Sequence, residues 1–214
     1  MSAPQSYYVP VDAGEAEFTE KRSRFLGHVR RVETEAEARA FLDEMRKKYY
    51  DARHNCWCYV LHEGGVVRYG DDGEPQGTAG QPMLNVFQRE GVENVVCVVT
   101  RYFGGVLLGA GGLTRAYARG AKTAVEAGGI AVMRLCRVYT VRCSYPLYQR
   151  LLSMLEQEAC AVGESVFTDQ VSFSLSMREQ DEARILEKLS EASAGTASAA
   201  FQCEKYVKYT VGAG

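Results

Sequence analysis

The sequence predicts an α+β protein built from two domains. A chain of 214 residues is long enough for two small domains. Strand and helix patterns follow one another irregularly in the first part of the chain, whereas the pattern from residue 137 onward is strand, helix, strand, strand, helix, strand. That βαββαβ order is typical of a ferredoxin-like domain. We therefore predict an N-terminal domain at residues 1–135 and a ferredoxin-like domain at residues 136–214.

The overall composition is that of a globular protein and argues against a membrane-spanning one. Hydrophobic residues make up 46% of the chain and charged residues 24%, and no stretch approaches the ~20 apolar residues of a membrane helix. The first ten residues lack the basic and apolar regions of a secretory signal, and the seven scattered cysteines favour reduced thiols over a disulfide framework. We expect a cytoplasmic protein with no membrane partner.

A strand and an amphipathic helix are the first predicted elements of the N-terminal domain. Basic and apolar residues alternate over residues 23–32, which predicts a strand. Thr34 and Glu37 then form a capping box, a pattern that marks helix starts. Apolar residues recur at helical spacing after this box, so the helix buries one face. They are Ala38, Phe41, Leu42, Met45 and Tyr49.

A hairpin, a loop and a short helix are expected next. Residues 54–62 and 66–70 have the composition of strands, and the Glu-Gly-Gly between them predicts a hairpin. The Gly- and Pro-rich segment that begins at Asp71 predicts a loop as far as Pro82, which suits the first turn of a helix running to about Arg89.

The most informative segment is an apolar strand that leads through a glycine-rich turn into a basic helix. Residues 94–100 are almost continuously apolar, as expected for the centre of a sheet. In the helix, small and apolar residues fall on one face, which can pack closely on that sheet. They are Leu113, Ala116, Tyr117, Gly120, Ala121 and Ala124.

The evidence for the ferredoxin-like domain is its regular patterning. Apolar residues alternate with serines over residues 171–177, which predicts a strand with one buried face. A helix is expected from about Tyr145 and another from about Glu179, and four apolar residues of the first fall on one face. These four are Leu147, Leu151, Met154 and Leu155.

The glycine-rich turn and the helix after it form a candidate anion or nucleic-acid site. Backbone N–H groups and the positive end of the helix dipole meet where glycines let a ligand approach closely. Four basic residues and no carboxylate lie between positions 101 and 122. The alternative is that the glycines only permit a tight crossover and the arginines form a solvated face. The candidate residues are Arg101, Gly104, Gly105, Gly109, Gly111, Gly112, Arg115, Arg119 and Lys122.

The acidic loop before the short helix is a second candidate feature. Asp71, Asp72 and Glu74 could hold a divalent cation beside a phosphorylated substrate. Turn chemistry explains the same residues without any ligand, and a third possibility is that these carboxylates pair with Arg101 or Arg115 and fix the shape of a cleft. The candidate cleft residues are His54, Asp71, Asp72, Glu74 and Thr78.

The cysteines and histidines do not predict a metal centre. Cys56 and Cys58 lack the two-residue spacer of zinc and redox motifs, and no HExxH pattern is present. Cys56 shares a strand face with His54 and could act as a nucleophile, but only in an exposed, electropositive environment. We predict no metal, no cofactor and no catalytic residue.

Three segments in the same order resemble the IMPACT/YigZ family. They are ARHNCWCYV at 52–60, DDGEPQGTAGQPML at 71–84 and RYFGGVLLGAGGLTRAY at 101–117. The resemblance covers residues 17 to about 130, and the C-terminal half is similar to the small domain of bacterial members. It implies an N-terminal α/β sandwich like the second domain of small-subunit ribosomal protein five, and a C-terminal domain like those of elongation factor G. It further implies a link to translation, because eukaryotic relatives restrain a stress pathway that acts on initiation through a protein partner.

The favoured hypothesis is a binding protein linked to translational regulation that contacts RNA, the ribosome or another phosphate-bearing partner. Four phosphate contacts by the basic residues of the turn and helix would give a log–log salt slope of about −3.6 on duplex. One alternative is an enzyme acting on a small phosphorylated or carboxylated metabolite. A second is a protein-interaction module that binds no nucleic acid.

Overall fold

The computed structural model describes residues 6–209 and divides them into two compact units. One unit comprises residues 7–132, and the other comprises Ser6 and residues 133–209. The described residues form two five-stranded sheets, and helices and antiparallel strands mix along the chain, so the α+β class is confirmed. The domain boundary that we expect between residues 135 and 136 stays a prediction.

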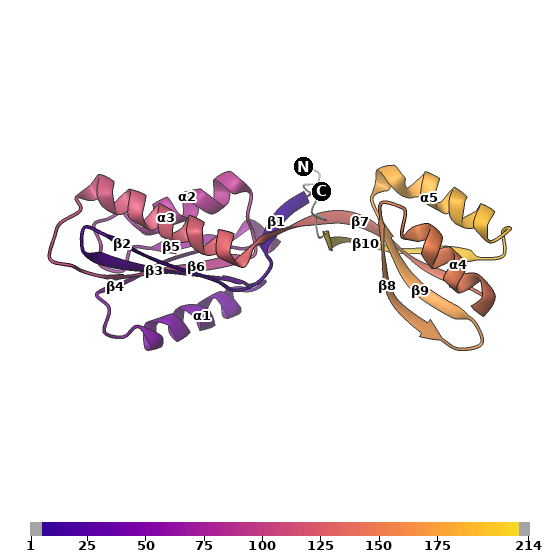
Figure 1. The fold of residues 1–214 in the computed structure, drawn as a ribbon, viewed down its shortest axis with the longest axis horizontal. Helices are drawn as coiled ribbons and strands as arrows, with labels where there is room; N and C mark the ends of the chain where they lie inside the picture. Colours follow the sequence, from indigo (N-terminus) through magenta and orange to yellow (C-terminus); the bar gives the residue numbers. More distant parts are fainter. Residues whose placement is uncertain (1–5, 210–214) are drawn as a thin grey trace. The chain divides into compact units, whose positions relative to one another are not determined.

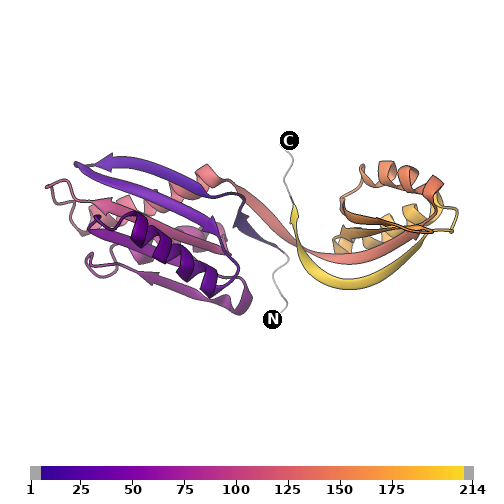
Figure 2. The ribbon, with the colours of Figure 1, turned by 90° about the horizontal axis from the view of Figure 1, so that it is seen from below.

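The N-terminal unit is a central sheet covered by helices on both faces. Its strand order is β2-β3-β6-β4-β5, and all four neighbouring pairs are antiparallel. Helix α1 covers one face, and α2 and α3 cover the other (Figure 1), as Figure 2 shows from the side of α1. The strands are β2 (Gly14–Glu20), β3 (Ser23–Arg31), β4 (His54–Val60), β5 (Val67–Gly70) and β6 (Val95–Tyr102), and the helices are α1 (Glu35–Lys48), α2 (Gly80–Glu90) and α3 (Ala110–Gly128).

The helices of this unit follow the sequence pattern closely. Thr34 caps α1 by accepting a hydrogen bond from the Glu37 N–H, and the predicted apolar face of α1 is buried as far as Met45. In α3 the predicted small and apolar face is buried against the sheet, with Tyr117 fully buried at its centre. A short 3₁₀ turn, η1 (Glu63–Gly65), joins the two strands of the predicted hairpin.

Two element boundaries differ from the sequence prediction. Helix α2 begins at Gly80, two residues before Pro82. Helix α3 begins at Ala110, so Gly111 and Gly112 lie in its first turn and not in the glycine-rich loop. A glycine costs a helix about 1 kcal/mol relative to alanine, which is why the sequence pattern favoured a later start.

The C-terminal unit has the predicted βαββαβ order. The strand order of its sheet is β1-β7-β9-β8 with β10 also paired to β7, and β9 pairs antiparallel with both β7 and β8. Of β1 (Ser6–Pro10), only Ser6 belongs to this unit. Apolar residues of α4 and α5 pack with alternate residues of the strands in one core. The elements are β7 (Ile130–Cys143), α4 (Tyr145–Leu155), β8 (Cys160–Phe167), β9 (Val171–Met177), α5 (Glu179–Ala192) and β10 (Ser198–Tyr209).

Candidate functional site

The end of β6, the following loop and the start of α3 form one wall of a cleft in the N-terminal unit. The cleft has a volume of 370 Å³. Its other wall comes from the start of β4 and from the acidic loop before α2, so it combines both candidate features of the sequence. The lining residues are Arg53, His54, Gly73, Glu74, Pro75, Arg101, Phe103, Leu107, Leu108, Gly109, Ala110 and Leu113.

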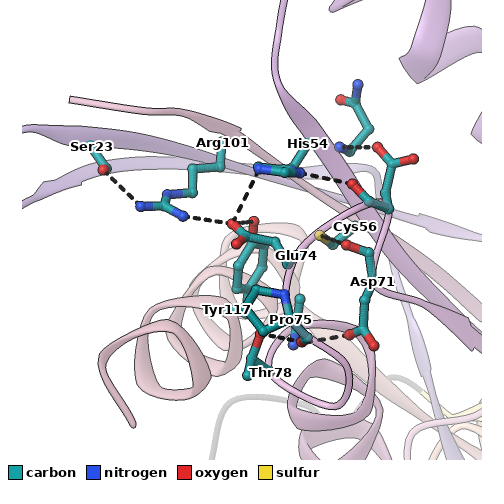
Figure 3. Close-up of polar contacts among 12 residues, drawn as sticks. Ser23, His54, Cys56, Asp71, Glu74, Pro75, Thr78, Arg101 and Tyr117 are labelled. Atoms are coloured by element: carbon teal, nitrogen blue, oxygen red, sulfur yellow. Dashed lines mark hydrogen bonds and ion pairs between the residues drawn. The ribbon is translucent and has the colours of Figure 1, made fainter. Parts of the chain in front are cut away.

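A buried ion pair joins these two walls. Nη1 of Arg101 donates to Oε1 of Glu74 at 2.7 Å, and both side chains are at least nine-tenths buried (Figure 3). The Tyr117 hydroxyl donates to the same oxygen at 2.8 Å. Nη2 of Arg101 lies 3.2 Å from the Ser23 hydroxyl. A carboxylate of the acidic loop thus pairs with Arg101, and the role of this pair in a functional cleft stays a prediction.

His54 is the titratable group beside this ion pair. Its Nδ1 lies 2.8 Å from the backbone carbonyl of Asp72. A carbonyl oxygen can only accept, so Nδ1 carries the proton in the neutral ring and Nε2 keeps its lone pair. Nε2 lies 4.0 Å from Oε1 of Glu74, beyond hydrogen-bond distance (Figure 3).

The other polar residues of the acidic loop hold the loop itself together. The Asp71 carboxylate accepts hydrogen bonds from the N–H groups of Gly77, Ala79 and Gly80, and so caps the start of α2. The Asp72 carboxylate accepts from the Asn55 N–H at 2.6 Å. With Glu74 bound to Arg101, all three carboxylates have protein donors, which a shared divalent cation would have to displace.

Thr78 and Cys56 also have structural contacts. The Thr78 hydroxyl donates to the Pro75 carbonyl at 2.6 Å, a bond within the loop. Cys56 is fully buried with its Sγ 2.9 Å from the Asp71 carbonyl, and burial raises the pKa of its thiol well above the usual range. A thiolate nucleophile needs exposure and a lowered pKa, so the geometry opposes that role for Cys56.

The start of α3 lines the cleft with Gly109, Ala110 and Leu113. Gly109 occupies the N-cap position with φ 73° and ψ 164°, and no side chain among the described residues caps the helix there. That backbone conformation is open only to glycine, so the residue type is explained by the way the chain enters the helix. The free N–H groups and the helix dipole make this end of α3 electropositive.

The basic residues of α3 line a separate groove beside the cleft. This groove has a volume of 240 Å³ and also receives Lys21 from the turn between β2 and β3. Arg115 and Arg119 are exposed, and the Arg119 guanidinium lies 4.3 Å above the Phe18 ring. Within residues 6–209 neither arginine nor Lys21 has an ion-pair partner, although Glu20 also lines the groove.

Two of the four predicted basic contacts lie elsewhere. Arg101 belongs to β6 and is 5% exposed, so its side chain is not available on the surface for the predicted phosphate contact. Lys122 is exposed but lies 3.8 Å from both Glu90 and Glu126. The free basic surface is therefore Lys21, Arg115 and Arg119, which we call the basic groove.

Several residues of these sites were missed by sequence analysis. Ser23 and Tyr117 were assigned only to a strand and to a buried face, yet they complete the hydrogen bonds of the ion pair. Arg53 and Lys21 were not singled out, because most residues that line the same cleft or groove are distant from them in the sequence. The place of Arg53 within the ARHNCWCYV segment was the one available signal.

Comparison with known proteins identifies the family of the chain. A model of the Impact N-terminal domain matches residues 21–125, and a model of a domain of unknown function, DUF1949, matches residues 141–196. IMPACT family member YvyE of Bacillus subtilis is 35% identical over 191 residues, which cover 89% of this chain and 88% of the relative. The chain belongs to the IMPACT family.

Other members cover the chain to different extents. IMPACT family member YigZ of Escherichia coli is 33% identical to this chain, and the aligned residues cover 82% of this chain and 88% of YigZ. Protein IMPACT of Rattus norvegicus is 32% identical over 112 residues, half of this chain and 35% of the rat protein. A crystal structure described as that of an hypothetical protein has a TM-score of 0.59 at 29% identity and covers 94% of this chain and 100% of its own.

Two further properties concern the described part of this IMPACT family protein. None of its helices between residues 6 and 209 is long and apolar enough to cross a membrane. No three His, Cys, Asp or Glu side chains in that range are grouped as a metal site would require.

Proposed function

We propose that this protein binds RNA, free or within the ribosome, through the basic groove, and that it acts in translational regulation in the cytoplasm. The observation that carries the proposal is the basic groove itself. Its three cations are exposed, have no ion-pair partner in the described residues and line the same groove. Unpaired cations along one groove are the usual electrostatic footprint of a phosphate backbone.

The geometry of the groove supports a backbone contact more than a contact with base edges. Arg115 and Arg119 lie one turn apart on α3, and Lys21 approaches from the neighbouring hairpin. The ring of Phe18 holds the Arg119 guanidinium at 4.3 Å, which limits its freedom before binding. The link to translation is supported by membership of the IMPACT family alone.

The experiment is co-sedimentation of the full chain with ribosomes and with RNA over a series of salt concentrations. An Arg115→Glu, Arg119→Glu variant is compared with an Arg89→Glu, Arg68→Glu variant of equal charge, because Arg89 and Arg68 are exposed outside the groove. Thermal melting checks that both variants fold. We expect salt-sensitive binding that is lost only in the groove variant.

Two outcomes would count against the proposal. Binding to ribosomes that survives the groove variant would favour a protein-interaction module that uses another surface. Absence of binding to ribosomes and RNA by the native chain would remove the proposed function altogether.

A further inference from the structure

The cleft beside α3 plays no part in the proposed RNA contact, yet it has the form of a small-ligand site. Ligand pockets are concave, mostly apolar and contain a few convergent polar groups. This cleft encloses 370 Å³ and places the buried side chains of His54, Glu74 and Arg101 in its wall. Charged groups buried in the wall of a cleft make it a candidate functional site.

We propose that this cleft binds a small organic anion. The anionic group lies at the first turn of α3 near Arg53, and the apolar part of the ligand contacts the loop after β6. This inference goes beyond the proposed RNA contact, because it concerns a separate cleft, other charged residues and a ligand of different size.

The charge of the cleft selects an anion. Glu74 is the one carboxylate among the lining residues, and Arg101 already neutralises it at 2.7 Å. Arg53 is exposed at the rim and has no ion-pair partner within residues 6–209. The N-cap Gly109 provides no side-chain acceptor for the N–H groups of α3. The remaining charge and dipole are therefore both positive.

The polar atoms of the wall are incompletely bonded. Nε of Arg101 is buried and has no hydrogen-bond partner among the described residues, although both terminal nitrogens do. A buried donor without a partner is uncommon and calls for an acceptor. The wall thus contains one buried donor without a partner among the described residues, close to the positive end of α3.

The apolar residues at the mouth indicate that the ligand is more than an inorganic ion. Leu107 is 83% exposed and Phe103 is 41% exposed, and both line the cleft together with Pro75 and Leu113. Covering such side chains with an apolar group removes their surface from water, which is favourable. A phosphate or carboxylate attached to an apolar body matches both parts of the cleft.

The test uses three probes and the full chain. Phenyl phosphate, phenylacetate and inorganic phosphate are titrated while backbone amide and His54 ring signals are followed by NMR. We expect saturable shifts at residues 109–112 and at His54 with an organic anion, and binding of inorganic phosphate at least about tenfold weaker because it lacks the apolar part. Comparison of the two organic probes identifies the anionic group.

Variants locate the site. Arg53→Ala removes the rim cation and should weaken binding about tenfold or more. Ala110→Phe places a large side chain at an exposed cleft position and should abolish binding. Arg89→Ala, which removes an exposed cation outside the cleft, should leave binding unchanged. Amide spectra of the free variants show whether each remains folded.

The outcomes separate this inference from the proposed function. Binding that is kept by Arg115→Glu, Arg119→Glu but lost in Ala110→Phe supports a distinct anion site. The inference is overturned if neither organic probe gives saturable shifts, or if Ala110→Phe binds like the native chain. Neither result bears on the proposed RNA contact, which is tested separately by co-sedimentation of the Arg115→Glu, Arg119→Glu variant.

Discussion

Arg101 and Glu74 form a buried ion pair, with 2.7 Å between Nη1 and Oε1, although 27 residues separate them in the sequence. Arg101 comes from β6 and Glu74 from the loop before α2. Tyr117 of α3 donates to the same Glu74 oxygen at 2.8 Å. Three segments of the N-terminal unit therefore meet at one carboxylate in the wall of the cleft.

Removal of one member of this pair should destabilise the protein strongly. Arg101→Met leaves the Glu74 carboxylate buried without its cation, which typically costs about 3–5 kcal/mol. Urea denaturation measures the change in the free energy of unfolding. The double variant Arg101→Met, Glu74→Gln removes the buried charge and keeps a partner for Tyr117, so it should recover much of the loss. A double variant no more stable than Arg101→Met would show that the charge is not the cause.

Two adjacent glycines should differ in their tolerance of alanine. A Cβ at Gly104 would lie 2.0 Å from the carbonyl oxygen of Arg22, so Gly104→Ala must displace the turn between β2 and β3. Gly105 has φ +82° and no atom within 4 Å of its Cβ position, so Gly105→Ala should cost only the backbone strain of about 1 kcal/mol. Thermal melting of both variants tests this order, and an equal loss would contradict it.

Asp71 should act as a helix cap and not as a metal ligand. Its carboxylate accepts hydrogen bonds from Gly77, Ala79 and Gly80 at the start of α2. Asp71→Ala should lower the free energy of unfolding by about 2 kcal/mol, the upper end of the cost of losing an N-cap. Addition of magnesium or of a chelator should leave the melting temperature of the native chain unchanged. The cation hypothesis would be supported if magnesium raised the melting temperature of the native chain but not that of Asp71→Ala.

The salt dependence of RNA binding should reflect three phosphate contacts. Sequence alone suggested four, but Arg101 is buried and Lys122 lies near two glutamates, whereas Lys21 joins Arg115 and Arg119. Three contacts on duplex give a log–log slope of about −2.7, and each alanine replacement should reduce its magnitude by about 0.9. Fluorescence anisotropy at several salt concentrations measures the slope. A slope unchanged by Arg115→Ala would exclude that residue from the contact.

The N-terminal unit should lose stability in alkaline solution. Burial raises the pKa values of the Cys56, Cys58 and Tyr117 side chains in the folded state, while unfolded thiols ionise near about 8.5. The folded state therefore keeps protons that the unfolded state loses, so this contribution is complete below about pH 8.5 and declines as pH rises. Each group contributes up to about 1.4 kcal/mol per pH unit.

A cysteine variant provides the control for this pH dependence. Cys56→Ala, Cys58→Ala should be less stable than the native chain at pH 7 because it loses buried contacts. Its free energy of unfolding should then fall less steeply between about pH 9 and 10.5, because two ionising groups are gone. Equal slopes for the two proteins in urea denaturation would show that these thiols do not control the alkaline loss.

The elements that sequence predicted well are those with a regular local pattern. The capping box at Thr34 and the small-residue face that contains Gly120 both appear as expected, and so does the alternation at residues 171–177. Such patterns are set by backbone geometry, which repeats every 3.6 residues in a helix and every two in a strand. The start of α3 was displaced because glycine weakens the helical signal although the tertiary structure tolerates it.

Neighbours along the chain were enough to predict the α+β class, the βαββαβ order and a glycine-rich turn before a basic helix. Which charges are free depends on the tertiary fold. It buries Arg101 against Glu74, leaves Arg115 and Arg119 exposed, and places Arg53 in the cleft and Lys21 in the basic groove. The reason is that the strength of a charge contact depends on burial and distance, and both are set by strand pairing and loop placement far along the chain.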